Sequence, residues 1–141
     1  MDEDDNTLSR IALLALFVTA LLAGCSSPAP DPAVGDGPLE VPRPDLSALD
    51  EASREAVEIE RAELDTVLED PSATAERRAV AYAEAGMMYQ AYGLYDAAEV
   101  CYRNVLDLDP GDYRWQYYLA QLYLDQESYE KASSTLVRVI E

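Results

Sequence analysis

The sequence predicts an all-α fold, in which a disordered tether and an N-terminal capping helix precede an α-solenoid of two helical hairpins. The main observation is a repeat with a period of 34 residues: residues 82–106 align with residues 116–140, and Gly86 falls on Ala120. Such periods are typical of stacked helical hairpins, each of which is too small to bury its apolar face alone. The other observations are turn residues between the expected helices and an abrupt change of composition near the N-terminus.

The first 24 residues contain an apolar segment of the kind that begins exported proteins. Residues 11–22 are apolar except for Thr19, a run shorter than the about 20 residues that span a bilayer but suited to a signal-peptide core. The segment ends in four residues that resemble the lipobox of bacterial lipoproteins: Leu22, Ala23, Gly24 and Cys25. The resemblance implies that a signal peptidase recognises the first three, cleaves before Cys25 and leaves a covalent lipid on its sulfur. An ordinary cleaved signal or a short uncleaved anchor is the alternative.

Residues 25–44 are predicted to be a flexible tether. They are rich in Pro, Gly, Ser and Asp, and they show no hydrophobic periodicity that would indicate a packed element. Within the lipoprotein resemblance, Ser26 after the lipidated cysteine is compatible with delivery to an outer membrane, facing the periplasm.

Residues 45–70 are predicted to form an acidic helix, with Asp45 or Ser47 as its N-cap and Pro71 as its stop. Apolar residues recur along it at helical spacing. It does not fit the 34-residue register, so we expect it to pack on the first hairpin as a cap. A short coiled-coil dimerisation helix is the alternative.

The two hairpins are expected within residues 75–141, as helices over about 74–92, 96–108, 113–126 and 129–141. Small residues, Gly86 and Ala98, are expected where two helix axes approach closely. Gly93 is expected to turn the chain in a left-handed conformation. Residues 109–112 should end the second helix, because Pro110 cannot continue it and Gly111 tolerates a positive φ.

This spacing resembles the tetratricopeptide repeat (TPR) family. Residues 79–112 align as one unit, and residues 113–141 as a second, looser unit. In the first unit Gly86 takes the eighth family position, and further consensus positions hold Tyr89, Tyr95, Ala98, Tyr102 and Pro110. Convergent patterning of helical hairpins is the alternative.

The resemblance also implies a binding site, because in this family the first helix of each hairpin lines a concave groove for a protein or peptide. By position, the groove would be formed by Val80, Ala83, Met87, Gln90, Arg114, Tyr117, Gln121 and Leu124. This mixture of apolar and aromatic residues with one cation suits an extended or helical peptide.

The composition argues against catalysis and against nucleic acid as a partner. The chain has no histidine, the usual general base and a common zinc ligand, and no cofactor or metal is expected. The aspartates of residues 107–112 are better explained by the turn between repeats than by calcium binding. The net charge of −18 disfavours nucleic acid and bare anionic membrane, but it permits basic partners. Cys101 is expected to be a small, partly buried residue of a helix.

The sequence therefore predicts a membrane-anchored TPR lipoprotein that acts as a protein–protein interaction adaptor in the bacterial cell envelope, and it predicts no enzyme activity. The alternative is the N-terminal part of a longer lipoprotein, whose further repeats or catalytic domain lie beyond residue 141. Two units are fewer than the about three that a stable stack needs, and Leu136, Val139 and Ile140 leave the last face apolar. Homodimerisation through this open C-terminal face would cover the same residues.

Overall fold

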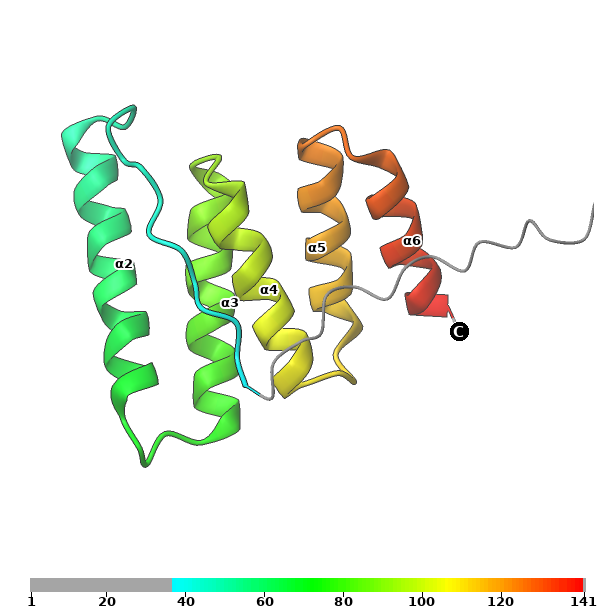
Figure 1. The fold of residues 1–141 in the computed structure, drawn as a ribbon, viewed down its shortest axis with the longest axis horizontal. Helices are drawn as coiled ribbons and strands as arrows, with labels where there is room; N and C mark the ends of the chain where they lie inside the picture. Colours follow the sequence, from blue (N-terminus) through cyan, green and yellow to red (C-terminus); the bar gives the residue numbers. More distant parts are fainter. Residues whose placement is uncertain (1–36, 141) are drawn as a thin grey trace, which may run out of the picture. The chain divides into compact units, whose positions relative to one another are not determined.

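The computed structural model describes residues 37–140, with side chains as far as Val137. Regular structure in this part of the chain consists of five helices: α2 (Glu51–Glu69), α3 (Ala75–Ala91), α4 (Tyr95–Leu108), α5 (Tyr113–Asp125) and α6 (Tyr129–Ile140). Each helix packs on the next one along the chain, as Figure 1 shows. The predicted all-α helical repeat is confirmed. The predicted signal segment lies outside the described residues.

Helices α2, α3 and α5 begin at residues whose side chains cap them, whereas Leu94 gives α4 no side-chain cap. Thr74 caps α3 by accepting a hydrogen bond from the backbone N–H of Arg77 at 3.1 Å. The N-cap of α2 is Asp50, whose carboxylate accepts the N–H of Ser53 at 2.9 Å, so the predicted cap at Asp45 or Ser47 is wrong. Asp45 instead accepts the N–H of Ser47 at 2.9 Å within a turn, which delays the helix. A cap of this kind stabilises a helix by about 1 kcal/mol.

The two hairpin turns use the left-handed conformation at equivalent positions. Gly93 has a φ of 73°, as predicted, and Glu127, one repeat later, has a φ of 58°. As predicted, α4 ends at Leu108, directly before residues 109–112. Gly111 is not among the described residues with positive φ, so Pro110 suffices to prevent continuation of the helix.

Replacing Glu127 with glycine is expected to raise the free energy of unfolding by about 1 kcal/mol. The left-handed conformation costs an L-residue about 1–2 kcal/mol and glycine almost nothing, although glycine gains entropy in the unfolded chain. Chemical denaturation measures the change. The matched control is Gln126→Gly, at a residue with a φ of −85°, which should give no gain. If Glu127→Gly were less stable than the unaltered protein, Glu127 would not be strained at this turn.

Close packing between α3 and α4 depends on Gly86. A Cβ added there would lie 2.9 Å from Cε1 of Tyr102 and 3.1 Å from Cβ of Cys101, which is too close for ordinary contact. Ala98 is completely buried, as expected of a small residue between helices. The ring of Tyr102 also stacks with Trp115 and Tyr118, at centroid distances of 6.4 and 5.9 Å, which joins α4 to α5. The core is therefore continuous from the first hairpin into the second.

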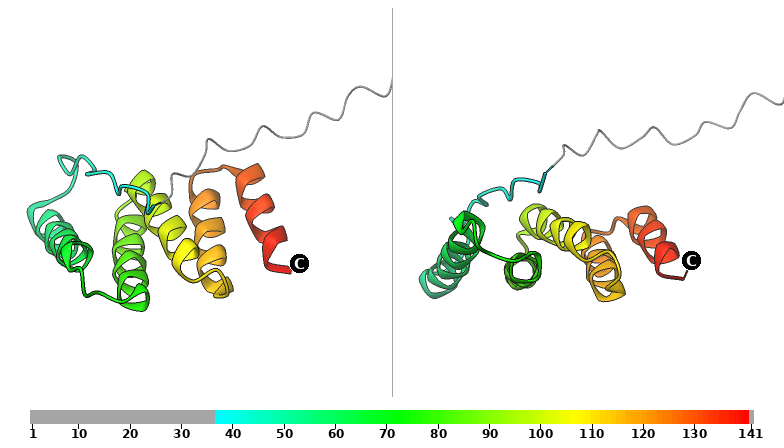
Figure 2. Two further views of the ribbon diagram at one scale, coloured as in Figure 1. Left: turned by 60° about the horizontal axis from the view of Figure 1, so that its bottom comes forward. Right: turned by 90° about the horizontal axis from the view of Figure 1, so that it is seen from below.

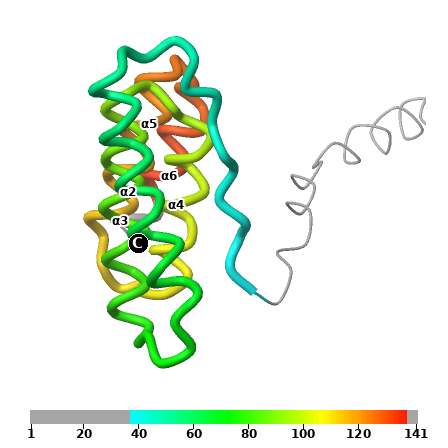
Figure 3. Tube along the Cα trace, turned by 90° about the vertical axis from the view of Figure 1, so that its left-hand side faces the viewer, coloured from blue at the N-terminus to red at the C-terminus, as the bar shows by residue number. Residues whose placement is uncertain are grey.

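Residues 37–44 form an extended strap, which corrects the prediction of a flexible tether there. Leu39 donates its N–H to Oδ1 of Asn104 at 2.7 Å and accepts from Nδ2 of the same side chain at 2.8 Å. Asn104 is 1% exposed and Val41 is 5% exposed, so the strap seals part of the core. Figures 1 and 3 show the strap, in cyan, running alongside the helices. Residues 25–36 of the predicted tether lie outside the described residues.

The strap is held along α2 by arginine. Nη1 of Arg61 donates to the carbonyls of Val41 and Pro42, at 3.1 and 3.3 Å. Arg43 forms an ion pair of 2.8 Å with Asp65, which also pairs with Arg61. Figure 2 shows that the strap lies on the side of the unit where α4 lies, whereas α3 and α5 lie toward the other side. The strap therefore leaves the outward faces of α3 and α5 uncovered.

Candidate docking surface

The large apolar residues of the predicted groove are exposed on α3 and α5. Val80 and Met87 are 50% and 39% exposed, and Tyr117 and Leu124 are 56% and 41% exposed. In each pair the residues are seven positions apart, which places them two turns apart on one face of their helix. We call these four residues the α3–α5 face.

Ala83 does not belong to this surface. Its side chain is 3% exposed and lies in the hydrophobic core. A methyl group ends below the surface that the longer side chains of Val80 and Met87 reach on the same helix. Ala83 is therefore a packing residue, and its assignment to the predicted groove is wrong.

The polar residues predicted for the groove bind other parts of the protein. Nε2 of Gln90 donates to Asp125 at 2.7 Å, and Oε1 of Gln90 accepts from the hydroxyl of Tyr102 at 2.9 Å. Gln121 donates to the other carboxylate oxygen of Asp125 at 3.3 Å. Burial raises the pKa of Tyr102, so its hydroxyl stays a donor at neutral pH. Gln90 thus joins α3 to α5, whereas the Gln121 bond lies within α5 and orients the Asp125 carboxylate that Gln90 contacts.

Arg114, the one cation predicted for the groove, is held by the cap of its own helix. Its Nε donates to Oδ1 of Asp112 at 2.9 Å, and its guanidinium lies over the ring of Trp115 at 5.9 Å. The hydrogen bond from Arg114 lowers the pKa of the Asp112 carboxyl. The Arg114 side chain is 67% exposed, so a partner would meet it as one half of an exposed ion pair with Asp112.

The other described cations are likewise paired. The further residues whose cationic groups contact carboxylates or backbone carbonyls are Arg43, Arg54, Arg61, Arg77, Arg78, Arg103 and Lys131. Since the chain has 28 acidic and 10 basic residues, most carboxylates are left over. The charge that a partner meets on the described surface is therefore negative.

Two hollows lie beside α2. The first, which we call the α2–α3 hollow, has a volume of about 470 Å³ and is lined by Ile59, Ala62, Glu63, Thr66, Val67 and Arg77. The second, of about 380 Å³, lies against the strap and is lined by Arg43, Pro44, Leu46, Val57, Glu58, Arg61, Ala62, Asp65 and Tyr89. Sequence reasoning missed both, because it assigned binding only to the two repeated hairpins. Because α2 does not share the 34-residue register, the sequence carried no signal for either hollow.

The repeat period, the two hairpins formed by α3–α6 and the close approach at Gly86 are features of a helical-repeat fold. A comparison of the chain with protein-family models is consistent with this helical-repeat fold. Residues 89–141 match the tetratricopeptide repeat. The match begins within α3 and runs through α6, so the strap and α2 lie outside it. No curated protein and no solved structure matches the chain.

The TPR match supports a role in protein–protein interaction, and TPR domains are generally not catalytic. In the part of the chain that the structure describes, no cluster of three or more His, Cys, Asp or Glu residues is placed to hold a metal ion. Within residues 37–140, none of the helices combines the length and the apolar character that crossing a bilayer requires.

Cys101 is a completely buried residue of the hydrophobic core and carries a free thiol, so it is more buried than the sequence suggests. Burial raises the pKa of this thiol from 9.0 to about 12. In the unfolded chain the thiol loses its proton near pH 9.0, whereas the folded protein keeps it, so the unfolded state binds fewer protons above that pH. Stability is therefore expected to fall as pH rises from about 9 toward 12, by up to about 1.4 kcal/mol per unit.

Chemical denaturation at about pH 8, 9 and 10 measures this dependence. The Cys101→Ala variant is the control, because it lacks the thiol whose pKa burial raises. It should lose less stability between about pH 9 and 10 than the unaltered protein does. Identical slopes for the two proteins would show that Cys101 does not carry the effect.

Proposed function

We propose that the chain is a lipid-anchored TPR lipoprotein of the bacterial cell envelope, which holds a protein partner on its α3–α5 face and has no catalytic activity. The observation that carries the proposal is the exposure of four large apolar residues on the outward faces of two neighbouring helices. Exposed apolar surface that is rimmed by polar groups is characteristic of interaction sites. The Gln90–Asp125 hydrogen bond supports this use, because it fixes the two helices that present the face.

The proposed anchor rests on the resemblance of residues 22–25 to a lipobox. Between Cys25 and Gly37 there are 37 − 25 = 12 residue steps, so the described unit would stand at most about 40 Å from the lipid. The strap lies on the side of α4, away from the α3–α5 face. This arrangement supports a tethered protein whose binding face stays accessible. Ser26 favours the outer membrane, facing the periplasm.

Replacing Cys25 with alanine is expected to abolish lipid labelling and to leave an uncleaved precursor, because the sulfur that accepts the lipid is gone. Metabolic labelling with palmitate, followed by membrane fractionation, measures both effects. Cys101→Ala is the matched control, since it removes the only other cysteine and should keep the label. If Cys25→Ala fractionates and labels like the unaltered chain, the anchor is wrong.

The interaction role is tested by capturing partners from envelope extract. Met87→Glu and Tyr117→Glu should each reduce capture at least about tenfold, since central apolar contacts carry most of the affinity of an interface. Both side chains are exposed, so the substitutions should leave the fold intact. Tyr129→Glu, on α6 and 65% exposed, is the control. Capture that neither groove variant reduces would place the partner elsewhere.

Homodimerisation through the open C-terminal face stays a prediction. Leu136 and Val137 of α6 are 39% and 49% exposed, so this end of the described unit presents apolar surface. Sedimentation of the chain with and without Val137→Glu tests the prediction. If the unaltered chain and the Val137→Glu variant are both monomers, the prediction of a homodimer is wrong.

A further inference from the structure

We propose that the α2–α3 hollow is a second docking subsite, outside the TPR match, which receives a basic amphipathic helix of the protein partner. The inference rests on the interaction role of the proposed function, and it is independent of the lipid anchor. The partner segment would be a helix with apolar side chains on one face and with Lys or Arg residues beside them.

The hollow has the size and lining of a docking site. Its volume of about 470 Å³ falls within the range of about 300–1,000 Å³ that is typical of ligand pockets. Ile59, at 55% exposure, is among the most exposed large apolar residues of the described helices, and it lines this hollow with Ala62 and Val67. An apolar side chain placed here would remove that surface from water, which favours binding.

The strap does not cover the hollow. Arg61 contacts the strap, whereas Glu63 lines the hollow. These residues are two positions apart on α2, so their side chains leave the helix in directions about 200° apart. The flank of α2 that faces away from the strap is therefore open to a partner.

The hollow adjoins the α3–α5 face. Arg77 lines its edge and lies three residues, or one helical turn, before Val80 on α3. A helix that crosses the outward sides of α5 and α3 would reach α2 next. One partner segment can thus occupy both surfaces, although only the α3–α5 face belongs to the predicted groove.

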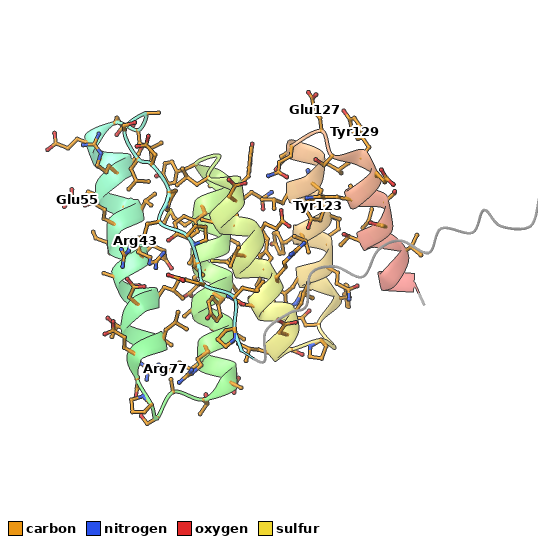
Figure 4. The ribbon with its side chains drawn as sticks, in the orientation of Figure 1. Arg43, Glu55, Arg77, Tyr123, Glu127 and Tyr129 are labelled. Carbon is orange, nitrogen blue, oxygen red and sulfur yellow. The ribbon has the colours of Figure 1, made fainter. Side chains whose placement is uncertain are left out.

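The charge at the hollow selects a basic occupant. Glu63 lines the hollow, and Glu60 lies close enough to Glu63 and Glu84 that burial first, and then repulsion by these two carboxylates, raises its pKa. The cation at the edge, Arg77, is paired with Asp70 at 3.2 Å, near the turn between α2 and α3 in Figure 4. A Lys or Arg side chain from a partner would relieve the repulsion, whereas an acidic peptide or an anionic lipid would increase it.

The probe is a fluorescent helical peptide of about 18 residues, built from Leu, Ala and Lys so that the Lys residues form one face. It is titrated into the full chain at low ionic strength, and anisotropy gives the dissociation constant. Ile59→Glu and Glu63→Lys should each weaken binding by about tenfold. The matched control is Glu130→Lys, an exposed residue of α6, which changes the net charge equally and should weaken binding less than about twofold. A peptide with Glu in place of Lys should not bind.

Four results would overturn the inference. Equal weakening by Glu63→Lys and Glu130→Lys would show that net charge, and not this hollow, attracts the peptide. Unchanged binding to Ile59→Glu, while Met87→Glu and Tyr117→Glu abolish it, would leave the interaction role intact and remove only the subsite. No binding of the Lys peptide to the unaltered chain would exclude a basic helix as the occupant. A dimer of the free chain that Ile59→Glu converts to monomers would make the hollow a self-association surface.

Discussion

The Gly86→Val variant is expected to lose about 3 kcal/mol of its free energy of unfolding, because overpacking a closed core costs this much. Even a single Cβ at this position would lie 2.9 Å from the ring of Tyr102. That ring cannot move aside easily, since it is completely buried and stacks on Trp115 and Tyr118. The better helix propensity of a residue other than glycine recovers less than about 1 kcal/mol of the loss.

Thermal and chemical denaturation measure the effect of Gly86→Val. Gly37→Val is the control, since an added Cβ at Gly37 meets nothing within 4 Å. The control should unfold within about 0.5 kcal/mol of the unaltered protein, as surface substitutions usually do. If Gly86→Val were as stable as the control, α3 and α4 would not approach each other as closely as the structure has them.

The Asn104→Ala variant is expected to lose about 2–3 kcal/mol and to release the strap, because buried hydrogen bonds are costly to break on one side only. The substitution removes both partners of Leu39, which lie at 2.7 and 2.8 Å, and leaves its backbone N–H and carbonyl without these bonds. Val41 would then become exposed along with the strap. The core beneath it would open to water beside α2 and α4.

Hydrogen exchange of the Leu39 amide reports on the strap directly, and denaturation reports on the whole unit. Arg43→Ala is the control: it removes an ion pair whose arginine is 73% exposed, and such pairs contribute at most about 1 kcal/mol. The Arg43→Ala substitution should change the exchange rate of the Leu39 amide very little. An Asn104→Ala protein with unchanged exchange and unchanged stability would show that the strap is held by other contacts.

Local signals made the helical hairpins predictable. The 34-residue period gives the register, Gly93 and Pro110 mark helix ends, and the small residue at Gly86 identifies a close contact between α3 and α4. These signals lie within a few residues of the structure they determine, or they recur in both copies. The four helices of the hairpins accordingly begin and end close to where the sequence predicts them.

The strap and the start of α2 were not predictable in the same way. Residues 37–44 have the composition of a linker, and what orders them is Asn104, whose side chain bonds to Leu39 across 65 positions of sequence. Asp45, Ser47 and Asp50 are all plausible caps by type, and only the turn before the helix selects Asp50. Long-range hydrogen bonds leave no periodic pattern in a single sequence.

The candidate binding residues were predictable as a face but not in detail. Helical period alone places Val80 and Met87 on one side of α3. It does not say that Ala83 is too short to reach the surface, or that Gln90 is bound by Asp125 from α5. The α2–α3 hollow depends on how two helices that share no repeat register pack together, and the sequence contains no rule for that contact.

Site-specific photo-crosslinking in the living cell tests the proposal that the chain binds its partner through the α3–α5 face. A benzophenone amino acid is placed at Tyr117 on this face and, in a second strain, at Asp107, an exposed residue of α4. Both positions are exposed, so both variants should fold and accumulate equally. We expect a discrete crosslinked adduct from the Tyr117 position and none from the Asp107 position. An adduct from Asp107 with none from Tyr117 would contradict it.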